Sequence, residues 1–255
     1  MWPNGFIGKK QLNRAIDTVL DNPLKEAPRP VSFSVIRIPL FLEPEYDPSK
    51  PFIETNRTRL IRKWGGEAGW NEQKKHHNLK GRGEEVGIKH FNLDRLASNT
   101  MASHRLIQHI GKNFGLAVSE KVYDRLNEYH FVEGHALNDL PRLSAVVAKE
   151  IEHILPEGMT FTEKQILDFL RGDEGTEQIK YARHALEQLG INSIPTFIID
   201  GSIMVGGAAS SDVFVKIFRE IEMKGEVNGP MLNDVLGVDE ATVLKGSHLP
   251  RKSLE

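Results

Sequence analysis

The side chains best suited to acid–base chemistry near neutral pH are the 10 histidines, and one of them lies in an informative position. His104 follows Thr100 by about one helical turn, so both side chains share one face of a predicted helix. A positioned imidazole can transfer protons in a reaction. The alternative is a histidine that is hydrogen-bonded and buried between helices, and the sequence favours this second explanation for His104.

Cysteine is absent from all 255 residues. This absence excludes disulfides, thiolate-bound zinc, iron–sulfur clusters and a thiol nucleophile supplied by these residues. The pair His76-His77 lies in a lysine-rich stretch, and adjacent residues on a helix point apart, so we expect no metal site. Gly81-Arg82-Gly83 follows no predicted strand and therefore does not indicate a dinucleotide site.

Charge and hydropathy restrict the partners and the location. The 33 Lys+Arg residues against 35 Asp+Glu give a net charge of -2, without the basic excess typical of nucleic-acid binding. No apolar run is long enough to span a membrane, and the start, Met-Trp-Pro-Asn-Gly, lacks the features of a signal peptide. We expect a cytoplasmic protein with neither nucleic-acid nor membrane partners.

The two ends of the chain combine helices with strands. Apolar residues recur at helical spacing over 7–20, and the β-branched alternation over 31–38 predicts a strand. A hairpin is predicted over 196–205, with its turn at Gly201-Ser202. It is followed by an amphipathic helix over 213–221, capped by Ser210 or Ser211.

The middle of the chain has helical periodicity and no strand signal. The strongest helix is predicted over 93–114, after a loose, charged and glycine-rich passage over 65–89. Strand character only at both ends predicts one α/β domain that carries a helical insertion. We expect four regions: a first core segment over 1–54, a helical insertion over 55–190, a second core segment over 191–224 and a loosely packed C-terminal extension over 225–255.

An ordered set of short motifs resembles the DsbA-like branch of the thioredoxin fold, and specifically its FrnE-like members. These relatives also include hydroxychromene-carboxylate isomerases and kappa-class glutathione transferases. The matching stretches are spread over nearly the whole chain in the family's order: Phe6-Ile7-Gly8-Lys9-Lys10, Glu85-Val86-Gly87-Ile88, the eight residues from Asn99 to Leu106, Phe131-Val132-Glu133-Gly134 and the eight residues from Gly190 to Phe197. The resemblance implies an α/β fold of the thioredoxin type with a large all-helical insertion.

The chain departs from that family at the active-site turn. Where redox members carry Cys-Pro-Trp-Cys, this sequence has Trp2-Pro3-Asn4-Gly5, which offers no thiol for disulfide exchange. The family also places a central strand immediately before this turn, and only Met1 precedes Trp2 here. Either the sheet lacks this N-terminal strand, or the true start of the protein lies upstream.

The resemblance also implies where a ligand would bind. Ile194-Pro195 matches a cis-proline pair whose preceding backbone binds a peptide or the cysteinyl group of glutathione. The helix that begins at Gly5 and Phe6 would favour an anion or a thiolate; the alternative is a plain helix start capped by Asn4. Asn99, Thr100 and His104 match the helix that faces the groove in the family.

Three functions remain open. The first is a cysteine-less enzyme, an isomerase or tailoring enzyme of secondary metabolism, acting on a small molecule or thiol conjugate, with glutathione as one candidate cofactor. The second is a thiol-disulfide oxidoreductase whose N-terminus is incompletely represented. The third is a non-catalytic pseudo-enzyme that binds a peptide or a partner. Catalytic residues stay unassigned, and a homodimer is left open.

Overall fold

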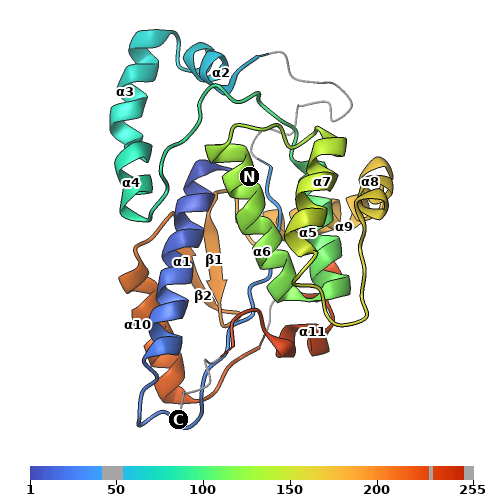
Figure 1. The fold of residues 1–255 in the computed structure, drawn as a ribbon. Helices are drawn as coiled ribbons and strands as arrows, with labels where there is room; N and C mark the ends of the chain where they lie inside the picture. The colour runs from blue at the N-terminus through green and yellow to red at the C-terminus, as the bar shows by residue number, and fades with distance from the viewer. Residues whose placement is uncertain (42–53, 230–231, 250–255) are drawn as a thin grey trace. The chain divides into compact units, whose positions relative to one another are not determined.

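The computed structural model describes residues 1–41, 54–229 and 232–249 (Figure 1). The chain forms two compact units. The helical unit comprises Met1, Phe41–Ile107 and Lys121–Thr176. The hairpin unit comprises Trp2–Leu40, Gln108–Glu120 and Glu177–Glu255.

In the hairpin unit, α1 (Pro3–Asp21) packs along α10 (Ser211–Lys224). Proline suits the first position of α1 because its φ is already helical and no N–H is lost from the helix. Apolar residues at helical spacing make the contact, and their burial is the main stabilising contribution of this unit. The members of this cluster are Leu12, Ala15, Ile16, Val19, Leu20, Phe214 and Phe218. The helix predicted over 7–20 is confirmed.

A two-stranded antiparallel hairpin, β1 (Thr196–Ile199) and β2 (Ile203–Gly206), packs against this helix pair. Its turn is centred on Asp200 and Gly201, which have φ values of 51° and 70°. Aspartate and glycine are among the residues that tolerate this left-handed conformation. The Asp200 carboxylate also accepts a hydrogen bond from Asn228 N at 2.7 Å. The hairpin is confirmed, with its turn one residue earlier than predicted.

The prediction of a strand over 31–38 is wrong, because this segment does not join the sheet. The segment forms one isolated bridge, in which Phe33 N donates to His248 O at 2.9 Å. Val31, Phe33 and Val35 do pack against the α1–α10 cluster, so the alternation identified the buried side. A strand needs a neighbouring strand for its ladder, and within the described residues the segment forms no ladder beyond this bridge.

The C-terminal residues of the hairpin unit are packed, contrary to the loose extension expected after residue 224. Two short helices, η2 (Asp234–Leu236) and α11 (Glu240–Lys245), follow α10. Leu236, Val238 and Val243 are buried with Leu116, and with Ala182 of α9 (Thr176–Gln188). Burial of these apolar side chains fixes a segment that lacks long-range periodicity in its sequence.

The helical unit contains helices throughout. They are α2 (Asn56–Lys63), α3 (Glu67–His77), α4 (Leu79–Glu85), the first half of α5 (Met101–Phe114), the second half of α6 (Leu116–Asn127), the π-helix η1 (Glu128–Val132), α7 (Leu140–Ile151) and α8 (Glu163–Arg171). The prediction of a loose passage over 65–89 is wrong, because α3 and α4 occupy most of this range. Asn78, with φ 41°, ends α3 and caps α4 through Gly81 N.

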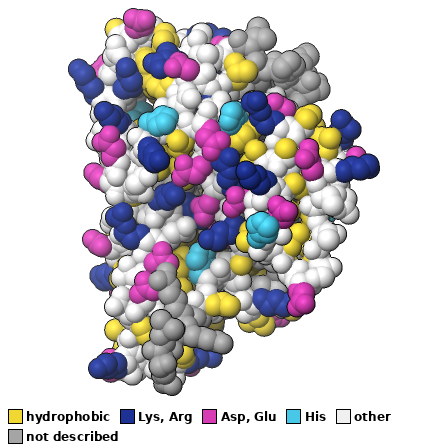
Figure 2. Space-filling view, in the orientation of Figure 1, with side chains coloured by type: hydrophobic (Ala, Val, Ile, Leu, Met, Phe, Trp, Pro, Cys, Tyr) yellow, Lys and Arg dark blue, Asp and Glu magenta, His cyan; other side chains and the backbone are white. Residues whose placement is uncertain are grey.

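Helix α5 begins at Met101, eight residues later than the helix predicted from Leu93. The Asn99 side chain accepts a hydrogen bond from Met101 N at 2.8 Å, which stabilises a helix start at this point. Within the described residues no helix is both long and apolar enough to cross a membrane. On the face seen in Figure 2, acidic and basic side chains are interspersed and form no basic stripe.

Candidate functional site

The start of α1 presents main-chain groups that no side chain covers. Trp2 occupies the N-cap position with extended φ and ψ of -141° and 148°, and its side chain forms no capping hydrogen bond. Asn4 therefore lies inside the first turn and is not the cap. Phe6 N donates to Trp2 O at 3.1 Å, whereas the N–H of Gly5 has no hydrogen-bond partner in the described chain. An unpaired N–H at the positive end of a helix favours an anionic ligand.

The loop before β1 packs directly on α1 one turn further along. The Ile194–Pro195 peptide bond is cis, as the resemblance implies. A Cβ atom on Gly8 would lie 3.1 Å from Pro195 Cγ and 3.1 Å from Phe197 Cζ. Glycine at position 8 therefore allows the proline loop to approach the helix backbone. Phe197 in turn contacts the Phe214 ring, with a centroid distance of 4.9 Å.

One edge of β1, called the open edge below, has no strand partner among the described residues, and the register shows which groups lie along it. Pro195 O accepts from Gly207 N at 2.8 Å, so the 195–207 pair is hydrogen-bonded. Hydrogen-bonded pairs alternate along an antiparallel ladder, so residues 197 and 199 bond to β2. The N–H and C=O groups of Ile194, Thr196 and Ile198 therefore point to the other edge, where none has a main-chain partner among the residues described.

The polar residues before α10 have a structural role. Ser210 is the N-cap residue, but its side chain makes no capping hydrogen bond. Instead Gln11 Oε1 of α1 accepts from Ser211 N at 3.0 Å. Sequence reasoning missed Gln11, because a glutamine on a helix carries no local signal for capping a helix 200 residues away.

Phe6 and the positions predicted on α5 contribute in different ways. The Phe6 side chain is completely buried in the hairpin unit, so its ring belongs to the core. In the helical unit, the Asn99 side chain caps α5, and Thr100 O accepts from His104 N at 3.0 Å. His104 is 8% exposed, and its Nε2 atom lies 3.3 Å from Met1 N. This environment is that of a buried, hydrogen-bonded histidine.

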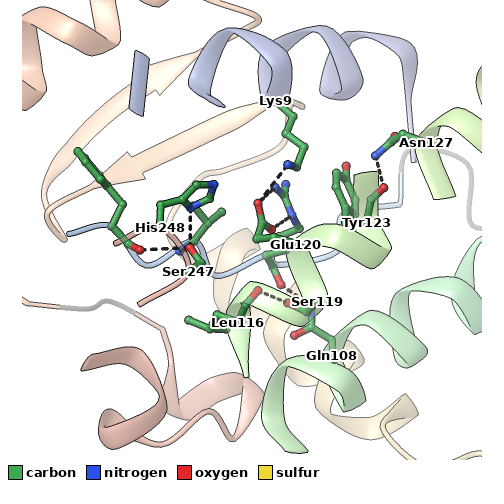
Figure 3. Close-up of polar contacts among 12 residues, drawn as sticks. Lys9, Gln108, Leu116, Ser119, Glu120, Tyr123, Asn127, Ser247 and His248 are labelled. Carbon is green, nitrogen blue, oxygen red and sulfur yellow. Dashed lines mark hydrogen bonds and ion pairs between the residues drawn. The ribbon is translucent and has the colours of Figure 1, made fainter. Parts of the chain in front are cut away.

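A buried ion cluster lies next to Gly8 along α1 (Figure 3). Lys9 points from α1 toward Glu120 on α6, with Nζ 3.3 Å from Oε2. Arg37 binds the same carboxylate through Nε at 2.5 Å and Nη2 at 2.7 Å. Burial alone would raise the pKa of Glu120, but Arg37 and Lys9 outweigh it and hold this pKa below its ordinary value. The three residues are far apart in sequence, and sequence analysis did not identify them.

Comparison with known proteins identifies a similar fold. No family model matches the chain, and no curated protein matches it in sequence. Among solved structures, a probable DsbA oxidoreductase from Streptomyces coelicolor matches with a TM-score of 0.68 and 20% sequence identity. The match covers 90% of this chain and 88% of the other. The chain therefore has a DsbA-like, thioredoxin-type α/β fold with a large helical region.

Proposed function

We propose that this protein is an enzyme that binds a small organic molecule or thiol conjugate where the Pro195 loop meets α1. The observation that carries the proposal is the unpaired N–H and C=O of Ile194, next to the cis-proline. Such groups can hold a peptide-like ligand, such as the cysteinyl group of glutathione, without any side chain. The unpaired N–H of Gly5 favours a carboxylate or thiolate in the same unit.

The absence of cysteine shapes the chemistry of this proposal. The 255 residues contain no thiol, so a reacting sulfur atom would belong to the ligand. We infer an isomerase or tailoring reaction rather than disulfide exchange by these residues. The FrnE-like resemblance is the reason for placing the reaction in secondary metabolism.

Calorimetric titration with glutathione and S-methylglutathione tests the binding step. We expect the Gly8→Ala variant to raise the Kd at least about tenfold, because its Cβ would push the Pro195 loop from α1. The matched control is Gly172→Ala after α8, since a Cβ there makes only ordinary contacts of 3.5 Å or more and Gly172 is not part of the proposed site. A wild-type protein that binds neither compound contradicts glutathione as the ligand.

Chromatography with mass spectrometry tests the catalytic step. Thiol conjugates incubated with the protein should yield a product of unchanged mass and altered retention if the enzyme is an isomerase. The Gly8→Ala variant should lose this conversion, and Gly172→Ala should keep it. Conversion at equal rates in both variants would show that the reaction occurs elsewhere.

A second candidate function, binding of a peptide or partner without catalysis, is favoured by the open edge of β1. The main-chain groups of Ile194, Thr196 and Ile198 match those of an added extended strand. The Ile198→Pro variant removes one edge N–H and should lose a stoichiometric partner that co-purifies with the wild type. Ile198→Val keeps this N–H and should retain it. A wild type that purifies without any partner contradicts this candidate.

A further inference from the structure

Arg95 in the helical unit carries a buried charge that no carboxylate of the described residues balances. Its side chain is on a residue only 6% exposed, and it forms no ion pair in the described chain. The neighbouring carboxylate of Asp94 binds Arg57 instead, at 2.7 and 3.1 Å. A buried cation without a counter-ion costs several kcal/mol, so such a charge needs an explanation.

The partners of Arg95 are neutral. Nε donates to His130 Nε2 at 3.2 Å, and Nη1 donates to Asn92 O at 2.6 Å. The guanidinium also lies 5.0 Å from the centroid of the Phe131 ring. His130 lies on the π-helix η1, and its Nδ1 is 2.8 Å from His135 O. Because Nε2 accepts from Arg95, Nδ1 carries the proton and His130 is neutral.

The surrounding charges do not neutralise Arg95 either. Burial, together with the nearby cation of Arg59, lowers the pKa of Arg95 to about 10. Burial and the Arg95 charge also hold the pKa of His130 well below 6.5. The described neighbours that act on Arg95 therefore add positive charge to it, or none.

Arg105, a second buried arginine of the same unit, shows how such a charge is balanced. It is 5% exposed, and it donates to the carbonyls of Phe169 and Leu170 at the end of α8 and to the carbonyl of Glu174 in the segment that follows. The two helix carbonyls lie at the negative end of α8, and the charges of Asp173 and Glu174 are favourable to Arg105. Arg95 has no equivalent set of acceptors among the described residues.

Three donors of Arg95 have no hydrogen-bond partner among the described residues. A guanidinium has five N–H groups, and two are used by His130 and Asn92, which leaves three. Both N–H groups of Nη2 are among these three. A planar fork with free N–H groups is the arrangement that binds carboxylate and phosphate oxygens.

We propose that Arg95 anchors a binding site for an oxyanion, the carboxylate or phosphate group of a small acidic molecule. The anion supplies the negative charge that the described residues lack. His130 holds the guanidinium in place by accepting the hydrogen bond from Arg95 Nε. This site lies in the helical unit and does not depend on the ligand proposed for the Pro195 loop.

Thermal unfolding with added inorganic phosphate or acetate, at constant ionic strength set with sodium chloride, tests the site. We expect a saturable rise in the melting temperature of the wild type with at least one of the two anions. The Arg95→Gln variant should weaken that apparent affinity about ten- to a hundredfold. Arg171→Gln removes the same charge from an exposed residue of the unit and should leave it unchanged.

A measurement on the wild type avoids any effect of Arg95→Gln on folding. Phenylglyoxal modifies accessible arginines, and peptide mapping gives the rate at each position. The effective anion should slow the modification of Arg95 at least about tenfold and leave Arg57 unaffected. A melting response identical to that of sodium chloride, or equal modification of Arg95 with and without the anion, would overturn the proposal. Phosphate and acetate, compared separately, distinguish the two oxyanions.

Discussion

The buried carboxylate of Glu120 has close partners of opposite sign. It is held by Lys9, which is also buried, and by the partly buried Arg37, all in the hairpin unit. The Arg37 backbone is fixed too, because its C=O accepts from Gln108 Nε2 at 2.5 Å. The cluster connects α1, α6 and the extended segment 31–38 by direct contacts.

We predict that Glu120→Gln lowers the free energy of unfolding by about 3–5 kcal/mol, because it removes the carboxylate that the buried Lys9 and the partly buried Arg37 both contact. Urea unfolding followed by circular dichroism measures the change. Glu152→Gln is the control, since Glu152 is exposed and should change stability by less than about 0.5 kcal/mol. Equal effects of the two substitutions would show that the Glu120 cluster does not stabilise the fold.

The same carboxylate predicts a pH dependence. The folded-state pKa of Glu120 is held below its ordinary value of 4.5, so its stabilising contribution is present above that pH. It is lost as the pH falls through the folded-state value. The difference in unfolding free energy between wild type and Glu120→Gln should therefore shrink on acidification below about pH 4.5. A constant difference between pH 7 and pH 3 in urea titrations would contradict this assignment.

At the scale of elements, the contact between α1 and the Pro195 loop depends on the glycine at position 8 and not on the glycine at position 5. We predict that Gly5→Ala raises the free energy of unfolding by about 0.5–1 kcal/mol, because its Cβ meets nothing and alanine favours a helix. Gly8→Ala should lower it by about 1–3 kcal/mol, since Pro195 and Phe197 must move. Thermal and urea unfolding measure the change in unfolding free energy for each variant. A change of the same sign in both variants would refute the packing argument.

Elements were predictable from sequence where the signal is local. The periodicity of α1 and the turn residues of the hairpin are local, and both elements were predicted. The segment 31–38 was not described correctly, because a ladder depends on a neighbour that periodicity cannot supply. The start of α5 was missed because the Asn99 cap outweighs the apolar spacing before it. The Lys9–Glu120 pair and Arg95 depend on contacts between distant residues, so no local pattern indicates them.

At the scale of the whole molecule, the fold is DsbA-like while its active-site turn lacks thiols. We predict that the double variant Trp2→Cys/Gly5→Cys forms a disulfide on oxidation, because residues three apart at a helix start can satisfy its geometry. The thiol introduced at position 2 should have a pKa below about 8.5, owing to the positive end of α1. Mass spectrometry and thiolate absorbance measure these two properties.

The single variant Trp2→Cys is the control, and it should show the lowered thiol pKa without an internal disulfide. A double variant that stays reduced under oxidising conditions would show that this turn differs in geometry from a redox-active one.

The open edge of β1 also affects how the protein behaves when it is concentrated. A row of main-chain donors and acceptors without a strand partner can pair with an extended chain, including the same edge of another molecule. Its flanking side chains include Ile198 and, on β2, the well-exposed Met204, and neither carries a charge that would repel a second copy. Aggregation through cross-strand pairing is therefore the expected failure of this protein in storage, and a lysine at position 198 is the simplest change to suppress it.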